Sequence, residues 1–555
     1  RLHVRIDERV AGFTALGIAR ETRRPAAVIC TSGTAAANLL PAALEAHHSG
    51  VPLILLTADR PPELRGVGAN QTTRQPGMFS PNVRWEADLP VPDAVDDDGS
   101  AEQTGMLRGV ADEAVAAALG AGARQAGPVH LNVPFREPLA GALPPWFGAA
   151  LTTSNAAVPP RGDETASADT AVDGSADLAG AEPSGAHYQG GGGIGEADQP
   201  GSDGDPLVLE RGVRTIVVAG SDAGPAAEEL AHQGGWPLVA EIVSGSRFGR
   251  HVVHGYRALL RDADLGGRVE RAVVFGHPTL SREVVALLSR DDVEVIAVRG
   301  PGEPLNLNGA TGAADAVVAA SGETDREWLG AWMRASRAAA VDLSPPAPDA
   351  DGLASAVPSE RLGAIAAELG ALRAPLDRET LVDAVWRASW PHDRLLFGSS
   401  RLVRVADAVL PGKKVPVHAN RGLAGIDGTV ATGLGIALAS QAAGAPGVTR
   451  VLLGDLALLH DAGSLLLPPG EQRPRVQVIV GNDGGGTIFD GLEVASVAGA
   501  AAMDRVLYTP HQTSLAQLAA AYGWEHLRVE TRSALDQALT APVTAPQLIE
   551  VPLPR

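Results

Sequence analysis

Two oxygen-bearing side chains, Asp455 and Asn482, each follow an apolar run of the sequence and could together hold a divalent cation. Each run is typical of a buried strand that ends in glycine, and the glycine-rich residues 484–486 follow Asn482. Magnesium prefers a few protein oxygens together with phosphate oxygens, and free amides of a glycine loop can bind a diphosphate. The pattern predicts a Mg²⁺-diphosphate site, and two ordinary strand-end turns of an α/β sheet are the alternative.

An acidic side chain, Glu8, follows the strand-like residues 2–6 at the point where a helical pattern begins. A carboxylate at such a position could protonate or hydrogen-bond a ring nitrogen of a cofactor, which is general acid/base work. It could equally be a helix-start charge that complements the helix dipole. The residues alone leave both roles open.

Small and polar residues follow two further strands in the N-terminal part. Residues 31–38 open a helix with small side chains, so that a ligand or another backbone could approach closely. Arg60 comes after the next strand, and Asn70 and Gln71 follow in the same loop. Ligands of open α/β sheets bind at the carboxyl ends of the strands, although Arg60 could instead pair with acidic residues of its own loop.

Arginines follow two neighbouring strands of the C-terminal part. Arg401 and Arg404 come after one strand and Arg421 after the next. Arginine suits bidentate recognition of carboxylates. These residues predict a cationic pocket in an otherwise acidic protein, and surface salt bridges are the alternative.

The sequence alternates between helical patterns and apolar, strand-like runs, and the fold built from these elements would position all of these residues. It predicts an α/β protein with three doubly wound parallel-sheet domains, at residues 1–150, 206–343 and 377–555. Helices are expected at residues 8–20 and 34–48. Strands are expected at residues 26–30, 51–57, 129–133, 214–219, 271–275, 293–298, 394–397, 415–418, 450–453, 476–480 and 547–551.

Two linkers are expected between the domains. Residues 151–205 hold ten acidic residues and one basic residue, and they are rich in Gly, Ala, Ser and Pro. Such a segment cannot bury enough apolar surface to offset its ordering entropy, so we predict a disordered acidic linker. Residues 344–376 form the second predicted linker, with a helical stretch near residues 360–369.

Composition narrows the range of partners. The formal net charge of −20 argues against nucleic acid and anionic membranes, and no apolar stretch is long enough for a membrane span. The single cysteine, Cys30, lies in an apolar run and is expected to be a buried small hydrophobe. One cysteine makes no internal disulfide, which favours a cytoplasmic enzyme.

These residues resemble the thiamine-diphosphate enzymes. The spacing of Gly454-Asp455 and Asn482 resembles their metal-diphosphate motif, with Leu456 in place of the usual second glycine, and residues 5–9 resemble their cofactor-activating glutamate segment. More narrowly, the chain resembles the 2-succinyl-5-enolpyruvyl-6-hydroxy-3-cyclohexene-1-carboxylate synthase (MenD) family. The narrower resemblance rests on residues 31–38, 56–64, 68–71, 420–422, 425–428 and 488–489.

The resemblance implies a transferase that decarboxylates 2-oxoglutarate and adds the resulting succinyl carbanion to isochorismate, in menaquinone biosynthesis. It implies thiamine diphosphate with Mg²⁺, or Mn²⁺, and a homodimer or homotetramer with active sites between chains. Glu8 would be the catalytic residue at the aminopyrimidine ring. The implied metal ligands are Asp455, Asn482 and the carbonyl of Gly484. The implied cofactor contacts are Glu8, Ser400, Ile426, Gly454, Asp455, Leu456, Asn482, Gly484, Ile488, Phe489 and Leu492. The implied substrate contacts are Arg60, Asn70, Gln71, Arg282, Ser400, Arg404 and Arg421.

Two rival functions remain open at this stage. Another thiamine-diphosphate lyase or carboligase, of the acetolactate-synthase type, would share the fold and metal site but would not need several arginines. Members of the family begin with a strand, a helix and a loop whose Ser and Arg reach the substrate, and we expect this chain, which starts at Arg1, to lack that segment. A catalytically inactive homologue that only binds cofactor is therefore the second rival.

Overall fold

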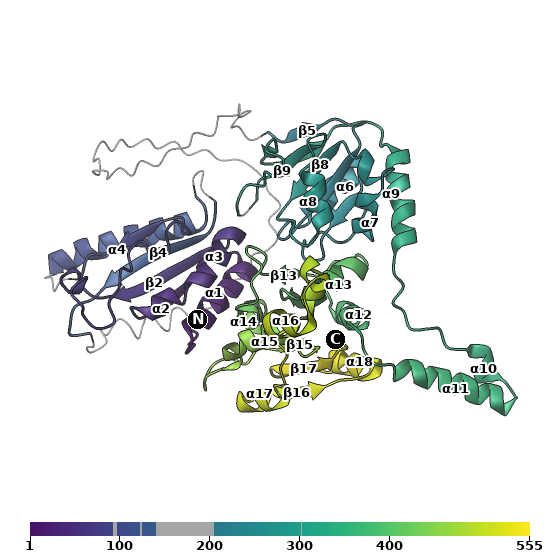
Figure 1. Ribbon diagram of the computed structural model, residues 1–555. Coiled ribbons are helices and arrows are strands. Elements are labelled where there is room, and N and C mark those ends of the chain that lie inside the picture. Colours follow the sequence, from purple (N-terminus) through teal and green to yellow (C-terminus); the bar gives the residue numbers. More distant parts are fainter. Residues whose placement is uncertain (93–96, 122–124, 140–204, 301) are drawn as a thin grey trace. The chain divides into compact units, whose positions relative to one another are not determined.

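The structure is a computed structural model of the 555-residue chain. It describes residues 1–92, 97–121, 125–139, 205–300 and 302–555, and Figure 1 shows their helices and strands. The predicted acidic linker at residues 151–205 lies outside the described residues except for Asp205. Three parallel sheets define what we call block one (residues up to 139), block two (205–343) and block three (377–555).

Block one contains a four-stranded parallel sheet in the order β1-β2-β4-β3. Alternate residues of β2 face two cores, because successive side chains of a strand point to opposite faces. Leu53 and Leu55 pack with residues of α1 and α3, whereas Ile54 and Leu56 pack with residues of α4. Helices therefore cover both faces of the sheet. The elements are α1 (Glu8–Thr22), β1 (Ala26–Cys30), α2 (Thr34–Ala37), α3 (Leu40–Ser49), β2 (Leu53–Asp59), η1 (Pro62–Leu64), β3 (Glu86–Asp88), α4 (Asp97–Ala118) and β4 (Pro128–Pro134).

Block two has a five-stranded parallel sheet in the order β10-β9-β8-β6-β7 and a separate pair, β11 with β5. Ile216 and Val218 of β6 pack with residues of α7, α8 and α9, and Val217 and Ala219 pack with residues of α6. The strands are β5 (Leu207–Leu209), β6 (Thr215–Ala219), β7 (Leu238–Ala240), β8 (Arg271–Phe275), β9 (Glu294–Val298), β10 (Gly312–Ala314) and β11 (Val317–Ala319). The helices are α6 (Ala226–Gly234), α7 (Tyr256–Arg261), η2 (Gly266–Arg268), α8 (Arg282–Leu288) and α9 (Arg326–Ala339).

Block three has a six-stranded parallel sheet in the order β13-β12-β14-β15-β17-β16. Leu452 of β14 packs with residues of α12, α13 and α18, and Val451 and Leu453 pack with residues of α14, α15 and α17. The strands are β12 (Arg394–Phe397), β13 (Val417–Ala419), β14 (Thr449–Gly454), β15 (Val476–Asn482), β16 (Glu525–Arg528) and β17 (Gln547–Pro552). The helices are α12 (Arg378–Ala388), α13 (Arg401–Val409), α14 (Thr429–Ser440), η3 (Ala442–Gly444), α15 (Asp455–His460), η4 (Ala462–Leu465), η5 (Thr487–Gly491), η6 (Glu493–Ser496), α16 (Ala500–Met503), η7 (Asp504–Tyr508), α17 (Leu515–Ala521) and α18 (Arg532–Thr540).

The strand order of block three reverses between β12 and β14. β12 pairs with β13 on one side and with β14 on the other. The helices that follow β12 and β14, α13 and α15, pack against opposite faces of the sheet. Loops that leave neighbouring strands toward opposite faces open a crevice at the carboxyl edge, where ligands of doubly wound sheets bind.

The segment between blocks two and three contains α10 (Ala350–Ala354) and α11 (Pro358–Leu372). The helical stretch expected near residues 360–369 thus lies within α11. The domain boundaries drawn from the sequence stay predictions. In the described part of the chain, no helix combines the length and the apolar character needed to cross a bilayer.

The N-terminal residues 2–6 form no strand, so that expectation was wrong. The amide of Val4 donates to Glu471 at 2.9 Å, and the ring of His3 lies 3.0 Å from the same carboxylate. Leu2 and Ile6 stay exposed, because polar anchors rather than an apolar face hold this segment.

The single helix expected at residues 34–48 is two helices, α2 and α3, separated by Asn38 and Leu39. Pro41 lies in the first turn of α3. Proline has no amide hydrogen and is tolerated there, where helical amides have no partner.

His130 of β4 is a buried titratable group in the core of block one. Its Nε2 atom lies 2.9 Å from the Thr57 hydroxyl, and its ring packs edge-on against Phe79. Burial lowers the pKa of His130 from 6.5 to about 4. The unfolded chain takes up this proton below pH 6.5 and the folded chain does not, so the stabilisation is complete above pH 6.5 and is lost as the pH falls to 4.

When the pH falls from 7 to 4.5, we expect the free energy of unfolding to decrease less in His130→Gln than in the parent chain. The linkage amounts to about 3 kcal/mol at most. Urea unfolding at the two pH values measures it, with the exposed His392→Gln as the control. An unchanged pH dependence in the His130 variant would show that other groups cause the acid sensitivity.

Candidate active site

Asp455 is buried at the first position of α15, directly after β14. One carboxylate oxygen accepts the amide hydrogen of Leu456 at 2.7 Å, and the other accepts that of Gly485 at 2.9 Å. The Nε2 atom of His511 lies 3.1 Å from the second oxygen. Burial raises the pKa of Asp455, and the charge of Asp483 raises it further. A cation bound here would offset both effects, because an opposite charge favours the ionised form.

Asn482 ends the neighbouring strand β15, and Gly454 and Gly481 pair in register just before the two polar residues. The Asn482 side chain donates to Glu550 at 2.9 Å, so its oxygen faces the glycine loop, where it accepts the amide of Gly484 at 3.2 Å. Gly484 has a φ of 72°, in a region that favours glycine. The register thus brings the two predicted metal ligands to one edge of the sheet.

The oxygens at this edge suit Mg²⁺, which takes carboxylate, amide and carbonyl oxygens together with phosphate. Among the described residues there is no group of three His, Cys, Asp or Glu that could hold a metal ion. A cation would therefore use neutral oxygens beside Asp455. The hydroxyl of Ser399 nearby is buried and has no hydrogen-bond partner within the described residues, which leaves it available to a ligand.

A pocket of about 570 Å³ lies at the switch point between β12 and β14, and we call it the crevice pocket. The sequence predicted seven of its lining residues: Ser400, Ile426, Gly454, Asp455, Leu456, Ile488 and Phe489. The predicted contacts Asn482, Gly484 and Leu492 are not part of the lining. Sequence reasoning missed Arg378, which binds Asp483 at 2.6 Å in the same lining.

A second pocket, which we call the arginine pocket, shares Ile488 and Phe489 with the crevice pocket. Its cationic lining residues are Arg257, Arg261, Arg282 and Arg404, and Leu492 also lines it. Arg282 pairs with Glu493 at 2.6 Å, and both side chains are exposed. Burial lowers the pKa of Arg404, and the charges of Arg257 and Arg282 lower it further. Arg257, Arg261 and Arg282 each pair with a carboxylate, those of Asp407, Glu283 and Glu493, and Glu283 also lines the pocket. An anionic ligand beside Arg404 would offset the repulsion there.

Two of these arginines, Arg257 and Arg261, were not predicted. They lie one helical turn apart on α7, away from any strand end, so the strand-end criterion could not find them. Arg257 also pairs with the buried Asp407 at 2.6 Å. Arg401, which the sequence placed beside Arg404, lines the crevice pocket instead and pairs with Asp490 at 2.8 Å.

Arg421 is buried beside the arginine pocket and is held from two sides. Its guanidinium donates to the hydroxyl and the carbonyl oxygen of Thr279, at 2.9 and 3.1 Å. Glu45 of α3 accepts the next two amides of the chain, those of Gly422 and Leu423, both at 2.9 Å. A Cβ at Gly422 would lie within 3.0 Å of Ser49, His48 and the Glu45 carbonyl, so only glycine allows this approach.

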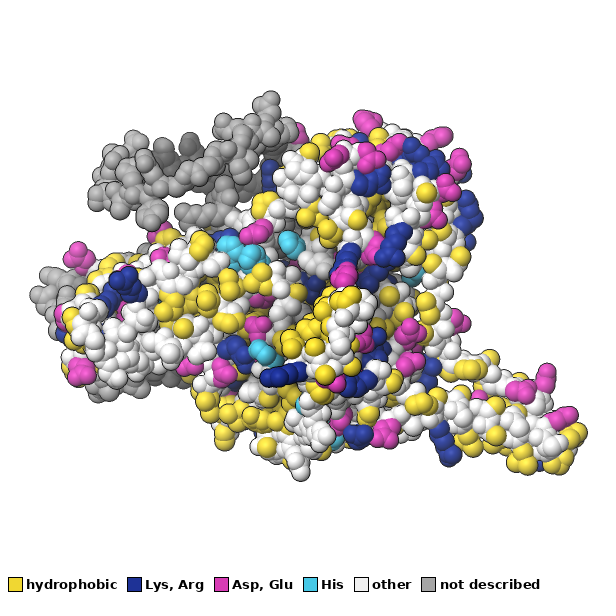
Figure 2. Space-filling model, in the orientation of Figure 1, with side chains coloured by type: hydrophobic (Ala, Val, Ile, Leu, Met, Phe, Trp, Pro, Cys, Tyr) yellow, Lys and Arg dark blue, Asp and Glu magenta, His cyan; other side chains and the backbone are white. Residues whose placement is uncertain are grey.

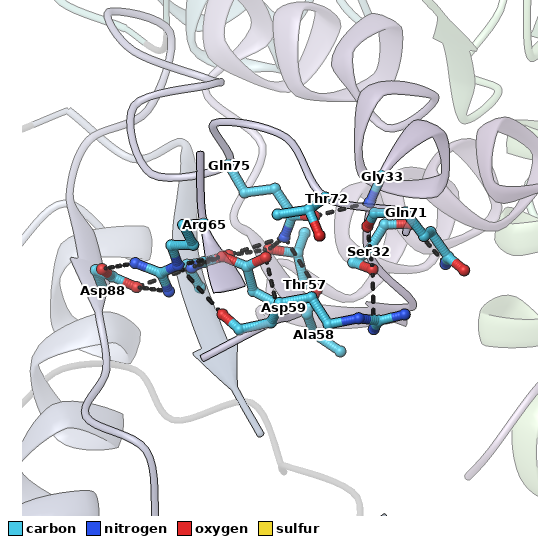
Figure 3. Close-up of polar contacts among 12 residues, drawn as sticks. Ser32, Gly33, Thr57, Ala58, Asp59, Arg65, Gln71, Thr72, Gln75 and Asp88 are labelled. Carbon is cyan, nitrogen blue, oxygen red and sulfur yellow. Dashed lines mark hydrogen bonds and ion pairs between the residues drawn. The ribbon is translucent and has the colours of Figure 1, made fainter. Parts of the chain in front are cut away.

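Block one holds a polar cluster at the carboxyl ends of β1 and β2, shown in Figure 3. Arg60 reaches the Ser32 hydroxyl at 3.4 Å, and the side chain of Gln71 donates to the Ser32 carbonyl at 3.0 Å. Gln71 has a φ of 57°, and the exposed Asn70 precedes it. The structure therefore brings Arg60 and Gln71 together. Sequence reasoning missed the fully buried Gln75, which accepts the Gly33 amide at 2.8 Å.

Glu8 is the first residue of α1, and the side chain of Asp7 caps this helix. The negative charge of Glu8 and, to a larger extent, burial raise the pKa of Cys30 to about 12. Cys30 is only partly buried, so the expectation of a fully buried cysteine was too strong. Among the described residues, those that line the crevice pocket belong to 378–553, and Glu8 is not one of them.

The fold and the cofactor-binding pattern define a thiamine-diphosphate enzyme. Residues 1–78 match the family described as thiamine pyrophosphate enzyme, N-terminal TPP binding domain. The structure is similar to the crystal structure of benzoylformate decarboxylase from Polynucleobacter necessarius, with a TM-score of 0.59 over 99% of this chain and 91% of that chain. At 15% identity this likeness shows the fold alone. The predicted fold class is confirmed.

Relatives with higher sequence identity identify one family within the thiamine-diphosphate enzymes. The 2-succinyl-5-enolpyruvyl-6-hydroxy-3-cyclohexene-1-carboxylate synthases of Leifsonia xyli subsp. xyli and Clavibacter michiganensis subsp. michiganensis are each 53% identical to this chain, over 100% of it and 89% of their own length. That of Kineococcus radiotolerans is 42% identical, over 99% of this chain and 87% of its own. The chain belongs to the 2-succinyl-5-enolpyruvyl-6-hydroxy-3-cyclohexene-1-carboxylate synthase family, which confirms the resemblance seen in the sequence.

Gly485→Ala should disrupt the crevice pocket. Its φ of 156° is one that side chains rarely adopt, and a Cβ there would lie 2.5 Å from the Tyr508 carbonyl oxygen. The loop must shift, and its amide would no longer reach Asp455. We expect a loss of about 2–4 kcal/mol in unfolding free energy and weaker binding of Mg²⁺-thiamine diphosphate.

Urea unfolding and calorimetric titration with the cofactor measure the two effects. The control is Gly499→Ala, where a Cβ meets nothing within 4 Å. Equal cofactor affinity in the Gly485 variant and the parent would show that the loop geometry does not matter for binding.

Proposed function

We propose that this protein is a thiamine-diphosphate-dependent transferase, a decarboxylating carboligase of menaquinone biosynthesis. It would decarboxylate 2-oxoglutarate and join the remaining succinyl group to isochorismate, giving 2-succinyl-5-enolpyruvyl-6-hydroxy-3-cyclohexene-1-carboxylate and CO₂. The observation that carries this proposal is the arginine pocket beside the crevice pocket in a chain of this family. A site for two acidic substrates needs fixed cations, because the chain as a whole is acidic, with a net charge of −20.

The crevice pocket would hold the diphosphate end of the cofactor. Asp455, Asn482 and the carbonyl of Gly484 would bind Mg²⁺, or Mn²⁺, and the amides of the glycine loop would face the phosphates. The side chains of Ile426, Ile488 and Phe489 would exclude water around the ring that reacts. When bound, thiamine diphosphate supplies the nucleophilic carbon and the electron sink for decarboxylation of a 2-oxo acid.

Glu8 would hydrogen-bond a ring nitrogen of the aminopyrimidine and hold the proton that moves when the cofactor is activated. Arg282, Arg404 and Arg421 would orient the carboxylates of the substrates, because a guanidinium binds a carboxylate through two parallel hydrogen bonds. Arg60, Asn70, Gln71 and Ser400 complete the proposed substrate set. Leu492 would pack at the boundary of the two pockets, since it lines the arginine pocket with Ile488 and Phe489.

A second copy of the chain would complete each site. Glu8 lies outside the lining of the crevice pocket within the described part of one chain, so the acid/base group and the metal ligands would come from different subunits. A two-fold homodimer would form two equal sites of this kind, and two dimers would form a homotetramer. The single cysteine favours a cytoplasmic location.

Mass identification of the product from 2-oxoglutarate and isochorismate, with and without thiamine diphosphate, tests the activity. We expect the named product and CO₂ only when the cofactor is present. Condensation of pyruvate instead would identify an enzyme of the acetolactate-synthase type. Cofactor binding without turnover of either substrate would identify an inactive homologue.

Asp455→Ala should abolish retention of Mg²⁺-thiamine diphosphate, because it removes the only carboxylate among the proposed metal ligands. Gel filtration followed by cofactor assay measures retention, with the exposed Asp490→Ala as the control. Retention equal to that of the parent would mean that the metal binds elsewhere.

Glu8→Gln should leave cofactor affinity nearly unchanged and lower kcat by about 10²–10⁴-fold, the usual contribution of a positioned acid/base group. The control is Glu113→Gln on the exposed face of α4. Turnover close to that of the parent would reduce Glu8 to a helix-start charge. Mixed dimers of Glu8→Gln and Asp455→Ala chains should regain activity, because one site in each is free of both changes. A lack of recovery in verified mixed dimers would place both groups on one chain.

A further inference from the structure

The loop at residues 278–281, between β8 and α8, contacts the arginines of the substrate side. Thr279 accepts two hydrogen bonds from the guanidinium of Arg421, through its hydroxyl and its carbonyl oxygen. These bonds use the Nε and Nη2 atoms of Arg421 and fix the plane of its guanidinium. The orientation of Arg421 therefore depends on where Thr279 lies.

The same loop also contacts one further arginine and caps the helix that begins with another. The carbonyl of Leu280 accepts a hydrogen bond from Arg257 at 3.3 Å. Ser281 caps α8, with its hydroxyl accepting the amide of Val284 at 3.1 Å, and Arg282 is the first residue of that helix. A shift of the loop would change the contact of Arg257 with Leu280 and the position of Arg282.

A buried carboxylate, Glu241, holds this loop from beneath. Glu241 follows β7 and is fully buried. One of its oxygens accepts the amide of Thr279 at 3.1 Å, and the other accepts that of Leu280 at 2.7 Å. Both oxygens are thus engaged with successive amides, an arrangement that a neutral amide side chain could satisfy only in half, because it offers one oxygen.

Burial and neighbouring charges both act on the Glu241 carboxyl group. Burial and the charge of Asp407 raise the pKa of Glu241 to about 8, although the two amides and Arg421 act in the opposite direction. A buried carboxyl is costly unless it makes good hydrogen bonds. An acidic side chain whose burial is costly therefore holds the loop that contacts the arginines.

We propose that Glu241 is a positioning residue for recognition of the acidic substrates, acting through Thr279 and Leu280 on Arg421 and on Arg257 and Arg282 of the arginine pocket. The inference rests on the proposed function, in which Arg282 and Arg421 bind substrate carboxylates. Glu241 itself is fully buried and would touch neither substrate nor cofactor. Its loss should change substrate affinity more than the chemical step.

The first test is Glu241→Gln in the full chain with saturating Mg²⁺ and thiamine diphosphate. We expect KM for at least one of 2-oxoglutarate and isochorismate to rise about tenfold, with kcat within threefold of the parent and unchanged cofactor affinity. The control is Glu270→Gln, a carboxylate of the same block that accepts the Arg214 amide at 2.9 Å near the surface. Unchanged KM for both substrates would overturn the inference.

A second variant, Thr279→Val, separates positioning from a general loss of stability. It removes the hydroxyl that Arg421 binds and keeps the backbone amide that Glu241 holds. KM should rise here too, while the melting temperature stays close to that of the parent. A normal KM in this variant would remove Thr279 as the link and overturn the route we propose.

A double-mutant cycle completes the test, since coupled residues give non-additive effects. In an Arg421→Ala background, Glu241→Gln should change KM less than twofold, because the residue it positions is absent. A full tenfold rise in that background would mean that Glu241 acts without Arg421. If the parent chain makes no product from the two acids, the proposed function fails first. If it turns over normally and the variants match it, only this inference fails.

Discussion

The parallel register of β12, β14 and β15 is the constraint on which the crevice pocket depends. Gly454 and Gly481 lie side by side, so the polar residues that follow them emerge at the same edge of the sheet. β12 pairs with β14 on the side opposite β13, which directs α13 and α15 to opposite faces. The loops separate there, and the space between them is the crevice pocket. A one-residue slip would turn every side chain of the strand to the other face.

The arginine pocket is lined by several basic side chains, whereas the chain as a whole has a negative net charge. The net charge is −20, and Figure 2 shows acidic and basic side chains interspersed on the face it displays. At the arginine pocket, in contrast, Arg257, Arg282 and Arg404 lie close enough for their charges to lower the pKa of Arg404. Asp407 pairs with Arg257 from a buried position, and Glu493 pairs with Arg282 at the surface. A bound anion near Arg404 would relieve the repulsion that lowers its pKa.

The sequence predicted those parts of the molecule that depend on local pattern. Buried strands such as β8 and β12 carry continuous apolar runs, and the expected bounds match them. Short strands such as β3 and β10 have only three residues each and no such run, so they were missed. Asp455 and Asn482 were found because they end strands. Gln75, Arg257 and Glu241 were not, because their partners are distant in sequence and the contact exists only in the folded chain.

Irregular loops carry most of the site, and their amides need acceptors that a sheet or helix would otherwise provide. Three buried carboxylates supply them, each by accepting two successive amides. Glu45 holds residues 422–423, Glu241 holds residues 279–280, and Asp461 holds residues 430–431 at the start of α14. Burial raises the pKa of Glu241 to about 8 and also raises that of Asp461, so the amides and nearby cations offset the cost of burial only in part.

Each of these carboxylates lies on an element other than the one it holds, and Glu45 holds a loop of another block. A loop fixed in this way cannot move without breaking contacts far from the ligand. The loops at residues 279–280 and 422–423 are thus held in place by carboxyl groups of other elements, although they form no regular secondary structure themselves.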